Sequence, residues 1–113
     1  MQLSDRQQEI IDEFEFYDSW MDKYEYLIEL GKDLPLISDE YKNEENLIKG
    51  CQSRVWLHAE YRNKSVSFFA DSDAIITKGI IALLIRVLNE QKPKNIIETK
   101  LEFINQIGLT NHL

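Results

Sequence analysis

The stretch that decides the fold is residues 46–70, NLIKGCQSRVWLHAEYRNKSVSFFA. Apolar and polar residues alternate along much of it, and this period of two is typical of strands that bury one face. The alternation predicts short strands over residues 47–49, 55–60 and 65–70. Residues 62–64, RNK, form a polar connection that predicts a hairpin between the last two strands. The stretch therefore predicts a small three-stranded antiparallel sheet.

Two helices are predicted before this sheet. Apolar residues recur at helical spacing over residues 5–14. Asp18 or Ser19 can cap a second helix, for which Gly31 is a suitable terminator. An apolar and aromatic stripe at helical spacing most often faces a core, so the stripe of this helix is interpreted as packing. Its members are Trp20, Tyr24, Leu27 and Ile28.

More helices are predicted after the sheet. Residues 74–89 form the longest apolar-rich stretch, and residues 71–73 (DSD) ahead of it are interpreted as caps. Gly79 weakens the intrinsic helicity of that stretch, which indicates close packing against the sheet. Short helices are predicted over residues 93–98 and 101–107. The fold class is therefore α+β, with the three-stranded sheet packed against helices from both ends of one domain spanning residues 1–113.

Cys51 is the only cysteine of the chain and sits at a predicted bend of the sheet. Gly50 can take backbone angles that are closed to other residues, so it can hold Cys51 at the tip of a loop. Lys49 and Arg54 supply nearby positive charge, which lowers the pKa of a thiol and raises its thiolate fraction. Cys51 is the candidate reactive residue. The residues predicted to support it are Lys49, Gly50, Gln52, Ser53 and Arg54.

Composition excludes several classes of function. The chain has 113 residues and a formal net charge of −7, which argues against a nucleic-acid surface and favours a protein or small-molecule partner. One cysteine cannot form an internal disulfide and is too few for a zinc site or an iron–sulfur cluster, so neither metal nor cofactor is expected. The start lacks a secretory pattern, and residues 79–85 are far too short to span a membrane. We expect a cytoplasmic protein that binds no membrane.

Four stretches of the chain resemble the SufE family of sulfur acceptors, in the same order and at matching spacing. Residues 44–56, EENLIKGCQSRVW, resemble the active-cysteine segment of that family. The other three are residues 20–35 (WMDKYEYLIELGKDLP), 70–82 (ADSDAIITKGIIA) and 107–113 (IGLTNHL). Relatives typically continue past the match to His112-Leu113 with a Ser-Pro-x-Arg segment and another helix. This chain is expected to lack that tail, and a partner contact made by its Arg cannot be transferred.

The resemblance implies a function and a fold. Cys51 would take persulfide sulfur from a pyridoxal-phosphate-dependent cysteine desulfurase similar to SufS, stimulate that enzyme and deliver the sulfur to an iron–sulfur scaffold. The chain itself would be a carrier and not an enzyme. Transfer is a thiolate attack on sulfur, so one accessible cysteine suffices without a cofactor. The fold is expected to be similar to that of SufE and IscU. Apolar neighbours of Cys51 further suggest a thiol sequestered in the free protein, with Gly50 as the pivot of release.

Three other interpretations stay open at this point. Cys51 could be a structural residue of a small acidic protein-binding module. It could instead be the nucleophile of a cysteine hydrolase, with His58 or His112 as base, although an extended strand would place His58 far from it. Finally, the acidic connector over residues 34–46 is either a solvated surface or a surface recognised by a basic partner.

Overall fold

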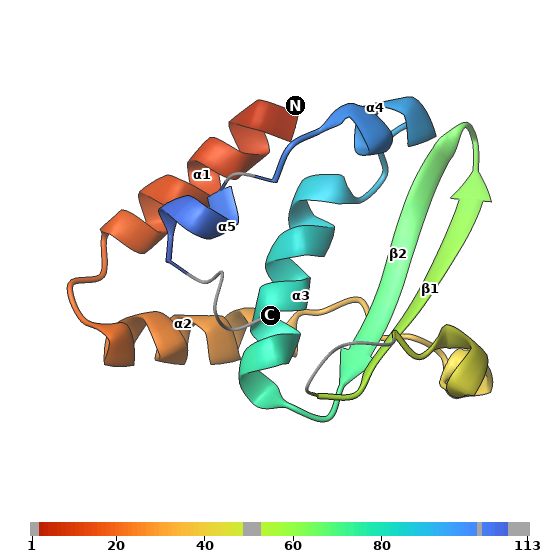
Figure 1. Cartoon of the computed structure of the whole chain (residues 1–113), viewed down its shortest axis with the longest axis horizontal. Helices are drawn as coiled ribbons and strands as arrows, with labels where there is room; N and C mark the ends of the chain where they lie inside the picture. Colours follow the sequence, from red (N-terminus) through yellow and green to blue (C-terminus); the bar gives the residue numbers. More distant parts are fainter. Residues whose placement is uncertain (1–2, 49–52, 102, 109–113) are drawn as a thin grey trace.

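The computed structural model describes residues 3–48, 53–101 and 103–108. A two-stranded sheet and the other helices are arranged around one long central helix, α3 (Figure 1). The elements in chain order are α1 (Leu3–Glu15), α2 (Trp20–Lys32), the 3-10 turns η1 (Asp39–Tyr41) and η2 (Glu44–Asn46), β1 (Val55–Arg62), β2 (Ser65–Ser72), α3 (Ile75–Leu88), α4 (Pro93–Glu98) and α5 (Phe103–Gln106).

The α+β class is confirmed, but the described residues form a sheet of two strands and not three. β1 and β2 pair antiparallel from Val55 opposite Ser72 to Arg62 opposite Ser65. Asn63 and Lys64 connect them with φ angles of 54° and 66°. Two successive residues with positive φ form the tight turn whose twist matches a hairpin. The predicted hairpin over residues 62–64 is therefore correct.

The predicted third strand over residues 47–49 is wrong as far as the structure describes it. Leu47 makes one isolated antiparallel bridge with Trp56 and the chain does not extend it into a ladder. The reason lies just before it, where Asn43 caps η2 by accepting a hydrogen bond from the Asn46 N–H. Because residues 44–46 are wound into that turn, the chain reaches the edge of β1 only at Leu47. Lys49 lies outside the described residues.

The free edge of β2 is covered by two irregular segments. Ala70 donates its N–H to Pro35 O at 2.9 Å and accepts from Ile37 N at 3.1 Å. This contact stays a single bridge at Leu36, because Pro35 has no N–H with which to continue a ladder. At the other end of the strand, Val66 N donates to Gln91 O at 2.9 Å. The segment after Pro35 is thereby placed against the sheet before it crosses to β1.

Two apolar clusters lie on opposite sides of α3, which is why this helix is central. One cluster joins α3 to α1, α2 and α5, and the other joins it to the sheet (Figure 1). The first contains Ile10, Ile11, Phe14, Leu27, Ile80, Leu83, Val87, Phe103, Ile104 and Ile107. The second contains Leu34, Val55, Ala70, Ile81 and Ile85. The predicted central role of residues 74–89 is confirmed.

The sequence had predicted that Gly79 packs against the sheet. This prediction is wrong, because Gly79 packs against α2. A Cβ atom built on Gly79 would lie 2.2 Å from the carbonyl oxygen of Leu27. Gly31 does not end α2, which continues to Lys32; its own Cβ would lie 3.1 Å from the backbone nitrogen of Gly79. Both glycines therefore allow two helix backbones to approach closely, and their role is packing.

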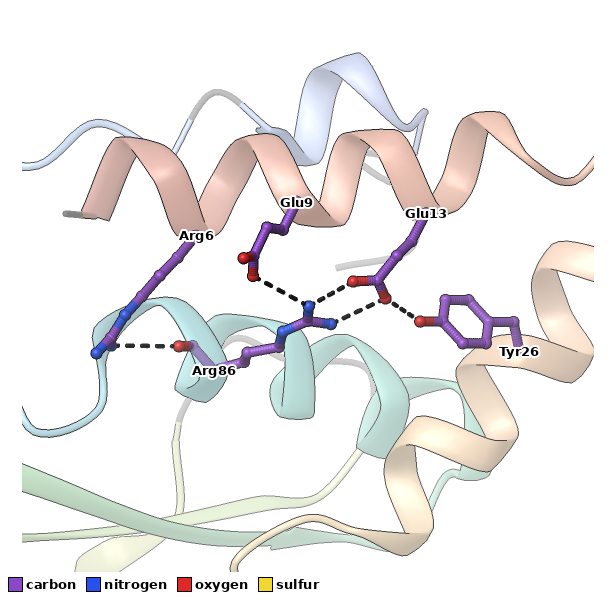
Figure 2. Close-up of polar contacts among 5 residues, drawn as sticks. All are labelled: Arg6, Glu9, Glu13, Tyr26 and Arg86. Carbon is purple, nitrogen blue, oxygen red and sulfur yellow. Dashed lines mark hydrogen bonds and ion pairs between the residues drawn. The ribbon is translucent and has the colours of Figure 1, made fainter. Parts of the chain in front are cut away.

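A polar network joins α1, α2 and α3 on the side away from the sheet (Figure 2). Arg86 donates from Nη1 to Glu13 Oε1 at 2.9 Å and also pairs with Glu9 at 3.6 Å. The Tyr26 hydroxyl donates to the same Glu13 carboxylate. Arg86 holds the pKa of Glu13 below its usual value, while burial and then Glu13 raise the pKa of Tyr26 to about 12. Arg6 separately caps α3, donating to Asn89 O at 2.9 Å.

The predicted helix ends agree with the structure in several places. Ser19 is the N-cap of α2 and accepts a hydrogen bond from Asp22 N at 3.2 Å. Pro93 stands in the first turn of α4, and Gly108, with a φ of 82°, follows α5. The aromatic stripe of α2 is only partly in the core, because Leu27 is fully buried while Trp20 is 43% exposed.

Candidate functional site

The loop that contains Cys51 leaves and re-enters the sheet at one end of the hairpin. On its N-terminal side, Ile48 N donates to Val55 O at 2.8 Å. On its C-terminal side, Arg54 N donates to the Asp73 carboxylate at 3.0 Å, and Asp73 N returns a hydrogen bond to Arg54 O at 3.2 Å. We call these three hydrogen bonds the loop clamp. They fix both ends of the segment that carries the cysteine.

The structure locates only part of the predicted site. Lys49, Gly50, Cys51 and Gln52 lie outside the described residues. Ser53 is half-buried in a bend, and Arg54 is exposed. Arg54 takes part in the loop clamp through its main chain, a role that its predicted contribution as a positive charge did not include.

A charged cluster lies on the sheet beside the loop clamp. Lys42 donates to Asp71 at 2.8 Å, and Lys78 of α3 lies 3.4 Å from the other oxygen of that carboxylate. Burial is the largest single influence and would raise the pKa of Asp71, but hydrogen bonds from Lys42 and the Ser72 N–H, together with the charges of Lys78 and Lys42, outweigh it and the pKa is lowered. Lys42 also lies 4.7 Å from the Trp56 ring centroid. This cluster attaches the acidic connector to β1 and β2 immediately next to the loop.

Sequence reasoning missed the roles of Lys42, Asp71 and Asp73, and interpreted the two aspartates as helix caps. Neither aspartate caps α3, whose N-cap is Ala74 without a side-chain hydrogen bond, and among the described residues Ser72 accepts only from Ala74 N, at 3.2 Å. The hairpin register contained the missing signal. With a two-residue turn at 63–64, pairing Arg62 with Ser65 necessarily brings Arg54 opposite Asp73. The turn type would have predicted the clamp.

Apolar side chains also lie around the loop clamp. Val55, which accepts a hydrogen bond of the clamp through its carbonyl, is 5% exposed. Ile48 on one side and Ile75 at the start of α3 are 39% and 61% exposed. The predicted apolar neighbours of the cysteine segment are therefore present at both ends of the loop, and two of the side chains there are available to a docking protein.

His58 does not have the environment of a catalytic base. Its ring stacks on Tyr41 with centroids 3.9 Å apart and an interplanar angle of 7°. Its Nε2 atom is buried and has no hydrogen-bond partner among the residues that the structure describes. The Glu60 carboxylate lies 3.7 Å away, beyond hydrogen-bond distance. A general base needs an orienting partner, so this geometry disfavours the hydrolase interpretation. His112 lies outside the described residues.

The described residues contain neither a cluster of metal-binding side chains nor a helix that could span a membrane. No group of three or more His, Cys, Asp or Glu side chains in this part of the chain is arranged to hold a metal ion. None of its helices combines the length and the apolarity that crossing a bilayer requires.

Comparison with known proteins decides the family. The SufE domain, described as an Fe–S metabolism associated domain, matches residues 8–113. The chain belongs to the SufE family. An uncharacterized SufE-like protein of Rhizobium meliloti (strain 1021) is 37% identical over 110 residues, which cover 93% of this chain and 79% of the relative. The cysteine desulfuration protein SufE of Wigglesworthia glossinidia brevipalpis is 34% identical over 105 residues, which cover 91% of this chain and 73% of that relative.

A second SufE-like protein, from Rhizobium etli, is 38% identical over 110 residues, covering 93% of this chain and 74% of the relative. The resemblance inferred from residues 44–56 is thereby confirmed at the level of the family. Membership of the SufE family makes the segment between the two ends of the loop clamp the candidate site, because this segment contains the only thiol in the sequence.

Proposed function

We propose that Cys51 of this SufE protein accepts sulfane sulfur from a pyridoxal-phosphate-dependent cysteine desulfurase and carries it as a persulfide. The downstream acceptor would be an iron–sulfur scaffold in the cytoplasm. The observation that carries the proposal is the single thiol of a SufE-family chain, in a segment whose flanking residues Ile48 and Arg54 are both held by hydrogen bonds. A relative that is named a cysteine desulfuration protein supports the same function class.

The transfer step needs only the two thiols. The Cys51 thiolate attacks the outer sulfur of the persulfide on the desulfurase cysteine. A new sulfur–sulfur bond forms at Cys51, the bond between the two desulfurase sulfurs breaks, and the desulfurase cysteine leaves as a thiolate. The transferred sulfur keeps its oxidation state, so no oxidant or reductant is consumed. The carrier would stimulate the desulfurase by removing the sulfur that blocks its next turnover.

The loop clamp supports a transfer in which only the loop moves. A carrier must protect its persulfide from water and oxidants, yet its sulfur must reach a second protein. Fixed loop ends at Ile48 and Arg54 confine any rearrangement to the residues between them. Gly50 is the proposed pivot because glycine tolerates large changes of φ and ψ. In this view docking of the desulfurase releases a sequestered Cys51.

Intact-mass measurement tests the proposal. The protein is incubated with a cysteine desulfurase of a SufE-dependent type and free cysteine, and its mass is measured before and after reduction. We expect the addition of one or more sulfur atoms that a thiol reductant removes, and no addition to the Cys51→Ser variant. An unmodified wild-type chain in the presence of an active desulfurase contradicts the proposal. Equal loading of the serine variant also contradicts it.

A further inference from the structure

The outer face of the sheet carries two neighbouring arrangements of aromatic and acidic side chains. This face points away from α3, because Val55, Ala70 and their alternate neighbours face the core. One arrangement lies at the cross-strand pair Trp56 and Asp71, and the other lies at the next pair on the same face, His58 and Phe69. The connector that holds η1 and η2 runs beside the strands at this end of the sheet (Figure 1).

The first arrangement already contains a cation. The ammonium group of Lys42 lies 4.7 Å from the Trp56 ring centroid and 2.8 Å from Asp71. An aromatic face and a carboxylate both attract a cation, and each attraction grows where water is partly excluded. The chain thus supplies its own occupant for this arrangement.

The second arrangement has the same ingredients around an open pocket. Tyr41 stacks on His58, and the Phe69 centroid lies 6.4 Å from that of His58. Together they border a cavity of about 320 Å³ lined by Leu36, Ser38, Glu40, Tyr41, His58, Glu60 and Phe69. Glu40 and Glu60 are its acidic lining residues, and no Lys or Arg is among the described residues that line it. We call this the aromatic–acidic pocket.

Two groups in the pocket have unused hydrogen-bonding capacity. Among the described residues, the Glu60 carboxylate has an ionisable group, His58 Nε2, at 3.7 Å, too far for a hydrogen bond. His58 Nε2 is itself buried without a hydrogen-bond partner in the described part of the chain. Because Nε2 is closed to solvent, the carboxylates of Glu40 and Glu60 are the acceptors that the pocket offers to an occupant with several N–H donors.

We propose that the aromatic–acidic pocket binds an arginine side chain of the docking cysteine desulfurase, an inference that rests on the proposed function. A guanidinium suits the pocket better than an ammonium, because it stacks on aromatic rings and offers five donors in a planar fork to two carboxylates. The pocket also lies close enough to the loop clamp. His58 is three residues from Val55 along β1, about 10 Å in an extended strand, and one standard interface covers about 800 Å² per partner.

The pocket is tested first without any desulfurase. A blocked tripeptide, glycine–arginine–glycine, is titrated into the isotopically labelled protein, and amide and side-chain shifts are followed by NMR. We expect saturable shifts at Tyr41, His58, Glu60 and Phe69. The matched peptide with citrulline, a neutral isostere of arginine, should produce none at the same concentrations. Equal shifts with both peptides, or shifts elsewhere on the protein, overturn the inference.

Variants of the pocket then test the partner. Glu40→Gln combined with Glu60→Gln should weaken binding of the arginine peptide and of the desulfurase by about tenfold each, as loss of charge-assisted hydrogen bonds predicts. Glu15→Gln combined with Glu25→Gln removes the same charge from exposed positions on α1 and α2 and should change neither. Peptide binding without any effect on desulfurase affinity overturns the assignment of the partner. Sulfur loading of Cys51 is measured separately, so loss of the pocket and loss of the proposed function remain distinguishable.

Discussion

Two regions of the molecule are held together by different kinds of contact. One is the interface between α2 and α3, and the other is the end of the sheet that carries the loop clamp. At the helix interface, backbones touch through Gly31 and Gly79, and the Glu13–Arg86–Tyr26 network seals one side (Figure 2). At the sheet end, two main-chain hydrogen bonds and one to the Asp73 side chain hold the residues on either side of the loop, next to the buried Val55. The first region is held by close backbone contacts and a charged network, whereas the second is held by three hydrogen bonds, of which the one to the Asp73 side chain is exposed.

This difference assigns stability and function to different places. Elements that move during function come from the less stable part of a structure, because their opening must be reversible at room temperature. Substitutions in the helix interface should therefore change global unfolding. Substitutions in the loop clamp should change the reactivity of Cys51 and leave global unfolding nearly unchanged.

Gly79→Ala should be the most damaging of these substitutions. Helix propensity alone predicts that alanine stabilises a helix by about 1 kcal/mol relative to glycine. The structure predicts the opposite, because the new Cβ would meet the Leu27 carbonyl at 2.2 Å and backbone cannot move aside cheaply. We expect a loss of about 3 kcal/mol in the free energy of unfolding, measured with urea. Gly31→Ala, whose closest contact is 3.1 Å, is the matched and milder control; unchanged stability in Gly79→Ala would contradict the close crossing.

Glu13→Gln should remove a smaller amount of stability, and only above acidic pH. The folded protein lowers the pKa of Glu13 from 4.5, chiefly through Arg86. The carboxylate therefore contributes stability above the unfolded pKa, and this contribution is lost as the pH falls through the lower, folded pKa. We expect the variant to be less stable by about 1 kcal/mol near neutral pH, since both partners are partly exposed.

Urea unfolding of the wild type and Glu13→Gln at a series of pH values measures this effect. The difference between the two proteins should shrink as the solution becomes more acidic than the ordinary glutamate pKa. A difference that is constant across the acidic range would show that the Glu13 carboxylate does not stabilise the helix interface by its charge.

Asp73→Ala should have the smallest effect on stability and a clear effect on Cys51. Loss of one partly exposed hydrogen bond to Arg54 N costs about 0.5–1 kcal/mol. With one end of the loop released, alkylation of Cys51 in the free protein should become several-fold faster. Removing the negative charge would also favour the thiolate, so Asp73→Asn is the necessary control. It removes the charge but keeps an oxygen acceptor; if Asn and Ala accelerate alkylation equally, the clamp does not restrain the loop.

Much of the fold could be predicted from the residues because it depends on local patterns. The Ser19 cap, Pro93 at the start of α4 and the alternation along β1 each act within a few residues. The prediction of a third strand was wrong because Asn43 caps the 3-10 turn η2, so the chain becomes extended only after Asn46. The predicted packing partner of Gly79 was wrong for another reason. A glycine in a helix indicates that another element comes close, but it does not indicate which element.

The site was predicted unevenly for similar reasons. Cys51 and its flanking residues were identified from sequence, and they stay predictions because residues 49–52 lie outside the described chain. The clamp by Asp73 and the Lys42–Asp71 pair join positions 19 and 29 residues apart. The first contact follows from the hairpin register, whereas the second depends on where the connector lies against the sheet, which no local pattern around Lys42 indicates.

The most direct test of the central claim is to locate the transferred sulfur. The protein is loaded by an active cysteine desulfurase with cysteine that carries a heavy sulfur isotope, blocked with an alkylating reagent and digested with trypsin. Cleavage after Lys49 and Arg54 isolates residues 50–54, which contain the only cysteine. The account predicts one or more heavy sulfur atoms on this peptide, released by reduction. A peptide that carries no heavy sulfur, while the desulfurase itself is labelled, would contradict the claim that Cys51 is the acceptor.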